Sequence, residues 1–232
     1  MSIREIKGNI FTTKAQTIVN TVNCVGVMGA GIALEFRLRL PNMYDRYVEL
    51  CKDRKLKPGI LWLYKSARPQ VLNFPTKVDW KYPSKVEYLE KGLQKFVATY
   101  KEKNITSIAF PLLGADKGGL APEISRNLLK QYLLPLEDLD VEIYEYDPEA
   151  GDDLYDKLAN FVRAKGIVEL STLTGITKAR LDILINAIVD GKTCQISQLG
   201  RLPGIGPATL EKLFAINFLQ GTESEQRSFF AD

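Results

Sequence analysis

The sequence predicts an α/β fold class: a layered domain with a largely parallel sheet, followed by a smaller all-α domain. Two observations support this. Strand and helix signals alternate over the first 147 residues, which is typical of layered α/β domains, whereas only helical patterns follow Asp152. Acidic residues, proline and glycine cluster at 147–151, between the two patterns. We therefore expect one domain at residues 1–150 and a helical domain at 151–232.

The elements of the first domain follow from the spacing of apolar residues. Strands are expected at 2–7, 17–20, 60–64, 71–75, 107–113 and 140–146. Helices are expected at 30–40, 42–52, 85–103 and 121–134. Pro41 separates the first two helices, because proline cannot continue a helix. The apolar runs at 60–64 and 71–75 predict buried strands.

The second domain shows no competing strand signal. Helical segments are expected at 153–166, 168–175, 177–191, 196–202 and 207–219. The last twelve residues, 221–232, are polar apart from a phenylalanine pair, and this composition predicts disorder.

Composition narrows the classes of function. The chain is 45% hydrophobic and 25% charged, typical of a globular protein, and its net charge of +3 does not by itself indicate nucleic acid. Three dispersed cysteines favour a reducing compartment over a disulfide or zinc framework. There is no histidine, which excludes imidazole-based catalysis. No apolar run reaches about 18 residues and the start lacks a signal sequence, so we expect a cytoplasmic protein with no membrane segment. The dispersed cysteines and the lack of histidine also lead us to expect no metal.

Three segments combine chemistry with a position after a strand. "GVMGAG", residues 26–31, and "PLLGADKGGLAPE", residues 111–123, each link a strand to a helix, and "VLNFPTK" places Lys77 after another strand. In parallel α/β sheets, ligands bind at the carboxyl ends of strands. Two glycine-rich loops at that edge could enclose a diphosphate. Spacing alone therefore indicates a phosphate-containing ligand and names no reaction.

These motifs carry a family resemblance. "GNIFTTKAQTIVNTVNCVGVMGAGIALEF", "VLNFPTK" and "SIAFPLLGADKGGL" together resemble the macrodomain family, the ADP-ribose-binding fold. Within it they are similar to the branch that contains the DarG antitoxins, which remove ADP-ribose from DNA bases, and the terminal ADP-ribose glycohydrolase. The resemblance covers residues 1–147 and implies a three-layer macrodomain with a mixed, largely parallel sheet.

The resemblance implies a role for particular residues. Asn9, beside Ile10, would read the adenine, where most macrodomains have aspartate; an amide oxygen can accept the same hydrogen bond. Asn23 would hold the distal ribose, Lys77 would be catalytic, and Tyr146 would stack on the adenine. The implied ADP-ribose site comprises Asn9, Ile10, Asn20, Val27, Met28, Gly29, Ala30, Gly31, Ile32, Leu113, Gly114, Ala115, Asp116, Lys117, Gly118, Gly119, Leu120 and Tyr146.

Two departures from the pattern bear on mechanism. Gly118 stands where the terminal ADP-ribose glycohydrolase has a catalytic aspartate, and Asp116, two positions earlier, does not align with it. The charged "GADKGG" also replaces the usual Cys-Gly-x pattern. The resemblance therefore favours a lysine-based mechanism over a lysine–aspartate pair, with Asn23 fixing the ribose.

The implied activity is ADP-ribosyl glycohydrolase action on modified DNA bases, without a cofactor. Two alternatives stay open: a non-catalytic ADP-ribose reader, and a hydrolase acting on ADP-ribosylated protein side chains. The implied partners are ADP-ribosylated DNA and a DarT-like toxin. Lys77 favours the enzyme over the reader.

The second domain contains two recognisable segments. "VELSTLTGITKARLDILINAI" reads as a helix-turn-helix with Lys178 and Arg180, and "ISQLGRLPGIGPATLEKLF" resembles a helix-hairpin-helix around Gly204 and Gly206. Hairpins of this type bind DNA phosphates through backbone N–H groups. Residues 152–232 hold nine Lys/Arg and ten Asp/Glu, which is not the basic surface typical of DNA-binding domains. DNA binding and a protein-contact role both stay open.

Overall fold

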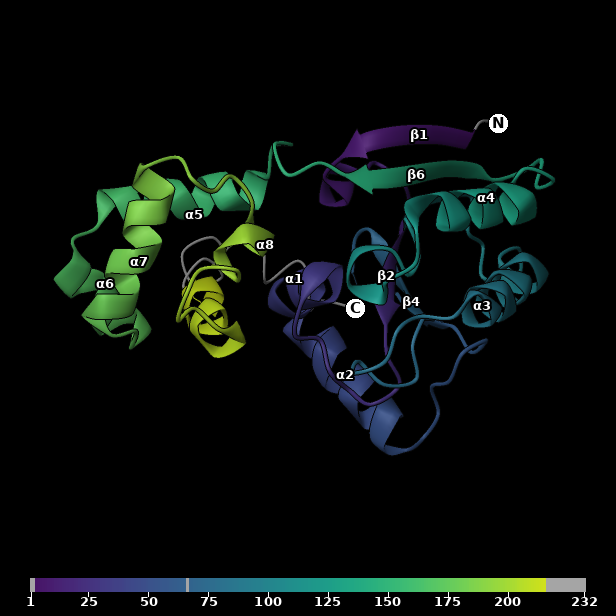
Figure 1. The fold of residues 1–232 in the computed structure, drawn as a ribbon, viewed down its shortest axis with the longest axis horizontal. Helices are drawn as coiled ribbons and strands as arrows, with labels where there is room; N and C mark the ends of the chain where they lie inside the picture. Colours follow the sequence, from purple (N-terminus) through teal and green to yellow (C-terminus); the bar gives the residue numbers. More distant parts are fainter. Residues whose placement is uncertain (1–2, 66, 216–232) are drawn as a thin grey trace. The chain divides into compact units, whose positions relative to one another are not determined.

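The computed structural model describes residues 3–65 and 67–215. The chain divides into two compact units, Met1–Pro148 and Glu149–Asp232, which are coloured purple to teal and green to yellow in Figure 1. The segment expected to be disordered, 221–232, lies outside the described residues. None of the described helices is long and apolar enough to cross a membrane.

The first unit is built on a six-stranded sheet with the order β1-β6-β5-β2-β4-β3. The strands are β1 (Ile3–Gly8), β2 (Thr17–Val22), β3 (Trp62–Tyr64), β4 (Gln70–Pro75), β5 (Ser107–Pro111) and β6 (Asp140–Tyr146). All neighbouring strands run parallel except β3, which pairs antiparallel with β4. The prediction of a layered α/β domain with a largely parallel sheet is therefore confirmed.

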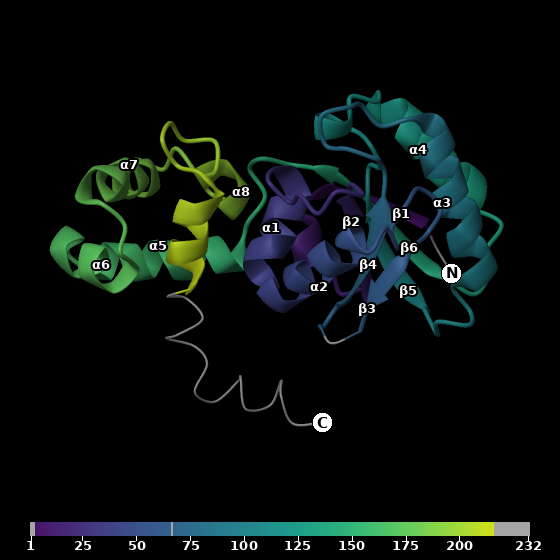
Figure 2. The same cartoon turned by 90° about the horizontal axis from the view of Figure 1, so that it is seen from below.

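Helices cover both faces of this sheet, as Figure 2 shows. The helices are α1 (Gly31–Arg39), α2 (Pro41–Lys52), α3 (Val86–Thr99) and α4 (Pro122–Leu133). Successive strand residues alternate between two apolar clusters: Val19 packs with residues of α3 and α4, while its neighbour Ile18 packs with residues of α1 and α2. The result is three layers with a core on each side of the sheet.

Two local features differ from the sequence-based expectation. The segment expected as a buried strand at 60–64 forms only the three-residue β3, whose residues are half-buried because it is the edge strand. Two short 3-10 helices, η1 (Ile10–Thr12) and η2 (Asp116–Gly118), were not predicted. Both follow strand ends, and both lie in segments implied to bind the ligand.

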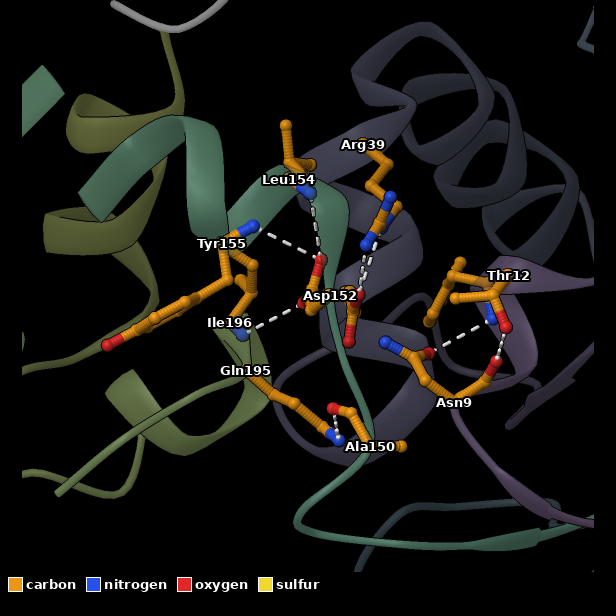
Figure 3. A network of polar contacts seen from close by, with 11 residues as sticks. Asn9, Thr12, Arg39, Ala150, Asp152, Leu154, Tyr155, Gln195 and Ile196 are labelled. Carbon is orange, nitrogen blue, oxygen red and sulfur yellow. Dashed lines mark hydrogen bonds and ion pairs between the residues drawn. The ribbon is translucent and has the colours of Figure 1, made fainter. Parts of the chain in front are cut away.

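The second unit is helical, as predicted. It contains α5 (Asp153–Ala164), α6 (Ile167–Thr174), α7 (Lys178–Val189) and α8 (Ile196–Leu199), and residues 207–215 are also helical. Asp152 is buried and links two of these segments, as Figure 3 shows. Its Oδ1 accepts the Leu154 and Tyr155 amides and so caps α5, while its Oδ2 accepts the Ile196 amide at 3.1 Å.

Candidate functional site

Three loops meet at the carboxyl ends of the parallel strands of the first unit. They follow β2 (residues 23–30), β4 (76–85) and β5 (112–121). A methyl group at Gly31 would lie 3.7 Å from Lys117 Cγ, so the two glycine-rich loops face each other as the sequence suggested. Gly31, Gly114 and Gly119 all have positive φ, a conformation that favours glycine.

Asn23 organises the first of these loops. Its buried side chain accepts the Val25 and Val27 amides at 3.0 and 3.3 Å and donates to the Val27 carbonyl at 2.5 Å. The Tyr47 hydroxyl, from α2, donates to the backbone and side-chain oxygens of Asn23 at 2.8 and 3.0 Å. Burial raises the pKa of Tyr47, so its hydroxyl keeps its proton as a donor. Asn23 therefore shapes the loop; its contact with a ribose stays a prediction.

Lys77 belongs to the loop after β4 and contacts the two glycine-rich loops after β2 and β5. Its Nζ donates to the Lys117 carbonyl at 2.5 Å, which directs the amine toward the loop after β5. Partial burial lowers the pKa of Lys77 from its ordinary value of 10.5, because desolvation disfavours the charged form. On the other side, Cys24 donates through its amide to the Val78 carbonyl at 2.9 Å and through its thiol to the Lys77 carbonyl at 3.2 Å. The lysine is thus held by contacts from both glycine-rich loops.

Ser84 supports the loop after β5. Its amide donates to the Gly118 carbonyl at 2.9 Å, and its hydroxyl is buried without a hydrogen-bond partner among the described residues. A Cβ at Gly118 would lie 2.7 Å from Ser84 Oγ, and one at Gly114 would lie 3.0 Å from Ser84 Cβ. Neither glycine can carry a side chain unless its neighbours move. The close packing of Ser84 against Gly118 therefore leaves no room for a carboxylate side chain at position 118.

Asn9 and Tyr146 lie at the opposite end of the same edge. Gly8 pairs with Tyr146 across β1 and β6, so Asn9 follows directly after the residue that faces this tyrosine. Tyr146 is 46% exposed. Asn9 is buried, and its Oδ1 accepts the Phe11 amide at 3.0 Å, capping η1. Its carbonyl accepts both the amide and the hydroxyl of Thr12 (Figure 3). This arrangement brings together the two residues that the sequence assigned to adenine.

The remaining implied residues differ in exposure, and Ile32, Ala115 and Leu120 are half-buried. Those with buried side chains are Ile10, Asn20, Met28 and Leu113, which lie in the interior, so a ligand could meet only their backbone. Asn20 pairs with Asn73 across β2 and β4, with a 3.0 Å hydrogen bond between their side chains. Residues exposed at the surface are Val27, Gly29, Ala30, Asp116, Lys117 and Gly119. Asp116 has φ +48°, a strained value for a residue other than glycine.

The second unit repeats one hairpin. Gly204, with φ +77°, and Gly206 lie in the turn before helix 207–215, and Gly175, with φ +61°, occupies the same place before α7. "LTGITKARLDIL", residues 173–184, and "LPGIGPATLEKL", residues 202–213, share the glycine, the isoleucine after it and three leucines at the same spacing. Ile176 and Ile205 are both buried. Lys178 and Arg180 lie exposed in the first turn of α7.

Several supporting residues were missed by sequence reasoning. Tyr47 and Ser84 gave no signal, because one lies in an amphipathic helix and the other before a helix. The hairpin at 174–178 could have been found by aligning the sequence with itself at an offset of 29 residues.

Comparison with known proteins identifies the first unit most clearly. The Macro domain family matches residues 19–129. A DNA ADP-ribosyl glycohydrolase from Thermus aquaticus is 37% identical over 187 residues, which is 78% of this chain and 48% of that protein. The chain thus spans about half the length of this curated relative. The alignment is longer than the first unit and so reaches into the second.

A second relative and two solved structures also match the first unit. A DNA ADP-ribosyl transferase–DNA ADP-ribosyl glycohydrolase fusion protein from Thermosipho africanus is 34% identical over 60% of this chain and 40% of that protein. The solved T. africanus DarTG in complex with ADP-ribose covers 65% of this chain and 43% of its own, with a TM-score of 0.59. The macrodomain of T. aquaticus DarG has a TM-score of 0.59 at 37% identity, covering 62% of this chain and 98% of its own. Since the first unit accounts for nearly all of that solved domain, the chain belongs to the macrodomain family.

Proposed function

We propose that this protein is an ADP-ribosyl glycohydrolase that removes ADP-ribose from modified DNA bases. The observation that carries the proposal is the position of Lys77, whose amine is partly buried and held by the Lys117 carbonyl where the three loops meet. The T. aquaticus and T. africanus relatives support it through their names. No cofactor is needed for this chemistry.

The geometry supports a sequence of steps. Backbone N–H groups of the two glycine-rich loops bind the diphosphate, and Asn9 and Tyr146 bind the adenine, so binding energy orients the distal ribose. The neutral Lys77 amine attacks C1″, the N-glycosidic bond breaks, and the base leaves with a proton from the amine. Water then hydrolyses the lysine–ribose adduct, which releases ADP-ribose and restores the amine.

A carboxylate is absent from this scheme for a structural reason. A side chain at Gly118 would collide with Ser84, and the Asp116 side chain is exposed, with its Oδ2 4.0 Å from the position of a Cβ at Gly31. Lys77 is therefore proposed to act without a paired acid from this loop.

The second unit is proposed to hold the DNA. Its two hairpins each present a glycine turn before a helix, and Lys178 and Arg180 stand on the surface beside the first. Backbone contacts of this type bind phosphates without reading sequence. A transferase toxin is the proposed protein partner, because the T. africanus relative joins both activities in one chain.

The proposal is tested with an ADP-ribosylated oligonucleotide, an ADP-ribosylated protein and free ADP-ribose. Release of ADP-ribose from the oligonucleotide is expected on a denaturing gel, with slower or no release from the protein. Calorimetry is expected to give a micromolar Kd for ADP-ribose, about −7 to −8 kcal/mol. Tight binding of the modified oligonucleotide without cleavage would make the protein a reader, and preference for the modified protein would change the substrate class.

A further inference from the structure

A turn beside Lys77 exposes two aromatic side chains. In the turn at 79–82, Trp80 is 53% exposed and Tyr82 is 67% exposed. The turn itself is ordered by hydrogen bonds: Asp79 accepts the Lys81 amide with its side chain at 3.0 Å and the Tyr82 amide with its carbonyl at 3.2 Å. Large aromatic rings usually bury most of their surface, so two on one ordered turn indicate a surface that meets something.

Hydrogen bonds on both sides of this turn hold it against the site. Before it, the Val78 carbonyl accepts the Cys24 amide at 2.9 Å; after it, the Ser84 amide donates to the Gly118 carbonyl at 2.9 Å. The turn therefore bridges the two glycine-rich loops, and Trp80 lies three residues beyond Lys77. The two rings therefore lie on a turn that is tied to both loops around Lys77.

The charges around the rings favour nucleic acid. Residues 77–85 contain Lys77, Lys81 and Lys85 and one acidic residue, Asp79, whose side chain already accepts the Lys81 amide. Lys81 Nζ lies 5.7 Å from the centroid of the Trp80 ring. Aromatic rings interleaved with lysines match the chemistry of single-strand binding, in which bases stack on the rings and cations track the phosphates.

We propose that Trp80 and Tyr82 stack on unpaired bases that flank the ADP-ribosylated base, so that this turn positions the substrate strand over Lys77. The inference rests on the proposed function and names the part of the substrate that the first unit reads beyond ADP-ribose. A docked protein would also cover apolar rings, but it would not require lysines between them, and it becomes one outcome of the test.

The experiment compares full-length variants for binding and cleavage of a labelled single-stranded oligonucleotide carrying ADP-ribose. Trp80→Ala and Tyr82→Ala are each expected to raise the Kd and KM about 5-fold to 100-fold, from the typical loss of one base–aromatic stack. The Kd for free ADP-ribose should stay within about twofold, since the rings lie outside the diphosphate loops. Trp80→Phe should recover most of the affinity. Leu134→Ala, at an exposed position after α4, is the control and should change neither value.

A second readout does not depend on cleavage. In a Trp62→Phe background, Trp80 is the remaining tryptophan, and its fluorescence should be quenched by the modified oligonucleotide. If the wild type binds this oligonucleotide without cleaving it, the hydrolase proposal fails while the stacking inference stands on affinity and quenching. Unchanged affinity of both alanine variants would overturn the inference. Alanine variants that no longer bind a protein partner but still bind the oligonucleotide would overturn it as well.

Discussion

The two units use glycine turns before helices in opposite ways. In the first unit, three loops of unrelated sequence converge. The loop after β2 brings the Asn23 amide, the loop after β4 brings the Lys77 amine and the buried Ser84 hydroxyl, and the loop after β5 brings the Lys117 carbonyl that Lys77 contacts. In the second, the same turn occurs twice, around Gly175 and Gly204. Both units place a lysine amine on a carbonyl beside such a turn, since Lys212 Nζ donates to the Gly175 carbonyl at 3.1 Å, but only in the first unit do the turns described here belong to loops of unlike sequence.

This difference indicates what each unit is suited to contact. Convergence of unlike groups at one point fits a single reacting bond, because each step needs its own chemistry. Repetition of one backbone element fits a partner that is itself repetitive, such as the phosphates of a nucleic acid. Side-chain hydrogen bonds hold the turns of both units: Tyr47 holds the first loop through Asn23, and Ser171 and Thr174 bond to the backbone of the buried Ile176 in the hairpin at Gly175.

The largest expected effect concerns Lys77. Lys77→Ala should lower cleavage of ADP-ribosylated DNA about 1,000-fold or more, the scale of removing a nucleophile, while the Kd for ADP-ribose changes only several-fold. Lys77→Arg separates the two roles of the amine, because arginine keeps the charge but is never neutral. An arginine variant that cleaves would show that Lys77 acts through charge. Lys117→Ala is the matched control, since it removes a neighbouring amine and keeps the backbone carbonyl that Lys77 contacts.

The pH dependence of cleavage should follow the same amine. Burial lowers the pKa of Lys77 below 10.5, and only the neutral amine attacks, so the rate should rise about tenfold per pH unit and level off below that value. The measurement is single-turnover cleavage from pH 6 upward. A rate that falls as the pH rises through this range would require an acid that must stay protonated.

Asn23→Ala should weaken both binding and turnover, about 10-fold to 100-fold in kcat/KM, because it removes several buried hydrogen bonds that fix the loop. Tyr47→Phe separates loop shape from ligand contact. It removes only the donor behind Asn23, so a loss of ADP-ribose affinity in this variant would show that loop order contributes to binding. Calorimetry together with thermal unfolding would measure both.

The second unit should affect DNA and not ADP-ribose. Removing residues 149–232 should leave the Kd for ADP-ribose unchanged and weaken DNA binding about 10-fold, consistent with the loss of a few phosphate contacts. Gly206→Phe tests the hairpin without removing the unit, because apart from its two chain neighbours no described residue has an atom within 4 Å of a Cβ there, so the new side chain should block the turn without disturbing the packing. Equal DNA affinity with and without the unit would assign the hairpins to protein contacts.

The smallest expected effect is at Asp116. Asp116→Ala should lower turnover only about 2-fold to 5-fold, since an exposed carboxylate contributes little to a charge inside the pocket. Asp116→Gly provides the control for backbone strain, because glycine accepts the positive φ that alanine resists. A large loss in both variants would move acid–base chemistry to this residue.

Sequence reasoning predicted the elements better than their contacts. Consecutive apolar residues such as Ile18 and Val19 predict a strand buried on both faces, and the position of Lys77 after a strand places it at the sheet edge. The link from Tyr47 to Asn23 joins residues 24 positions apart, and nothing in either local pattern indicates it. Nor does local pattern show that β3 runs antiparallel, since direction depends on the connection rather than on the strand.

The Asn20–Asn73 pair links correct folding to correct chemistry. The two amides meet only when β2 and β4 align as observed; a slip of one residue would place Asn20 opposite Leu72 or Phe74 and bury an amide without its partner, which costs about 1–3 kcal/mol. The same slip would displace Asn23 by about 3.3 Å relative to Lys77. An error in strand pairing that would separate these two proposed active-site residues is therefore penalised during folding, before any ligand is encountered.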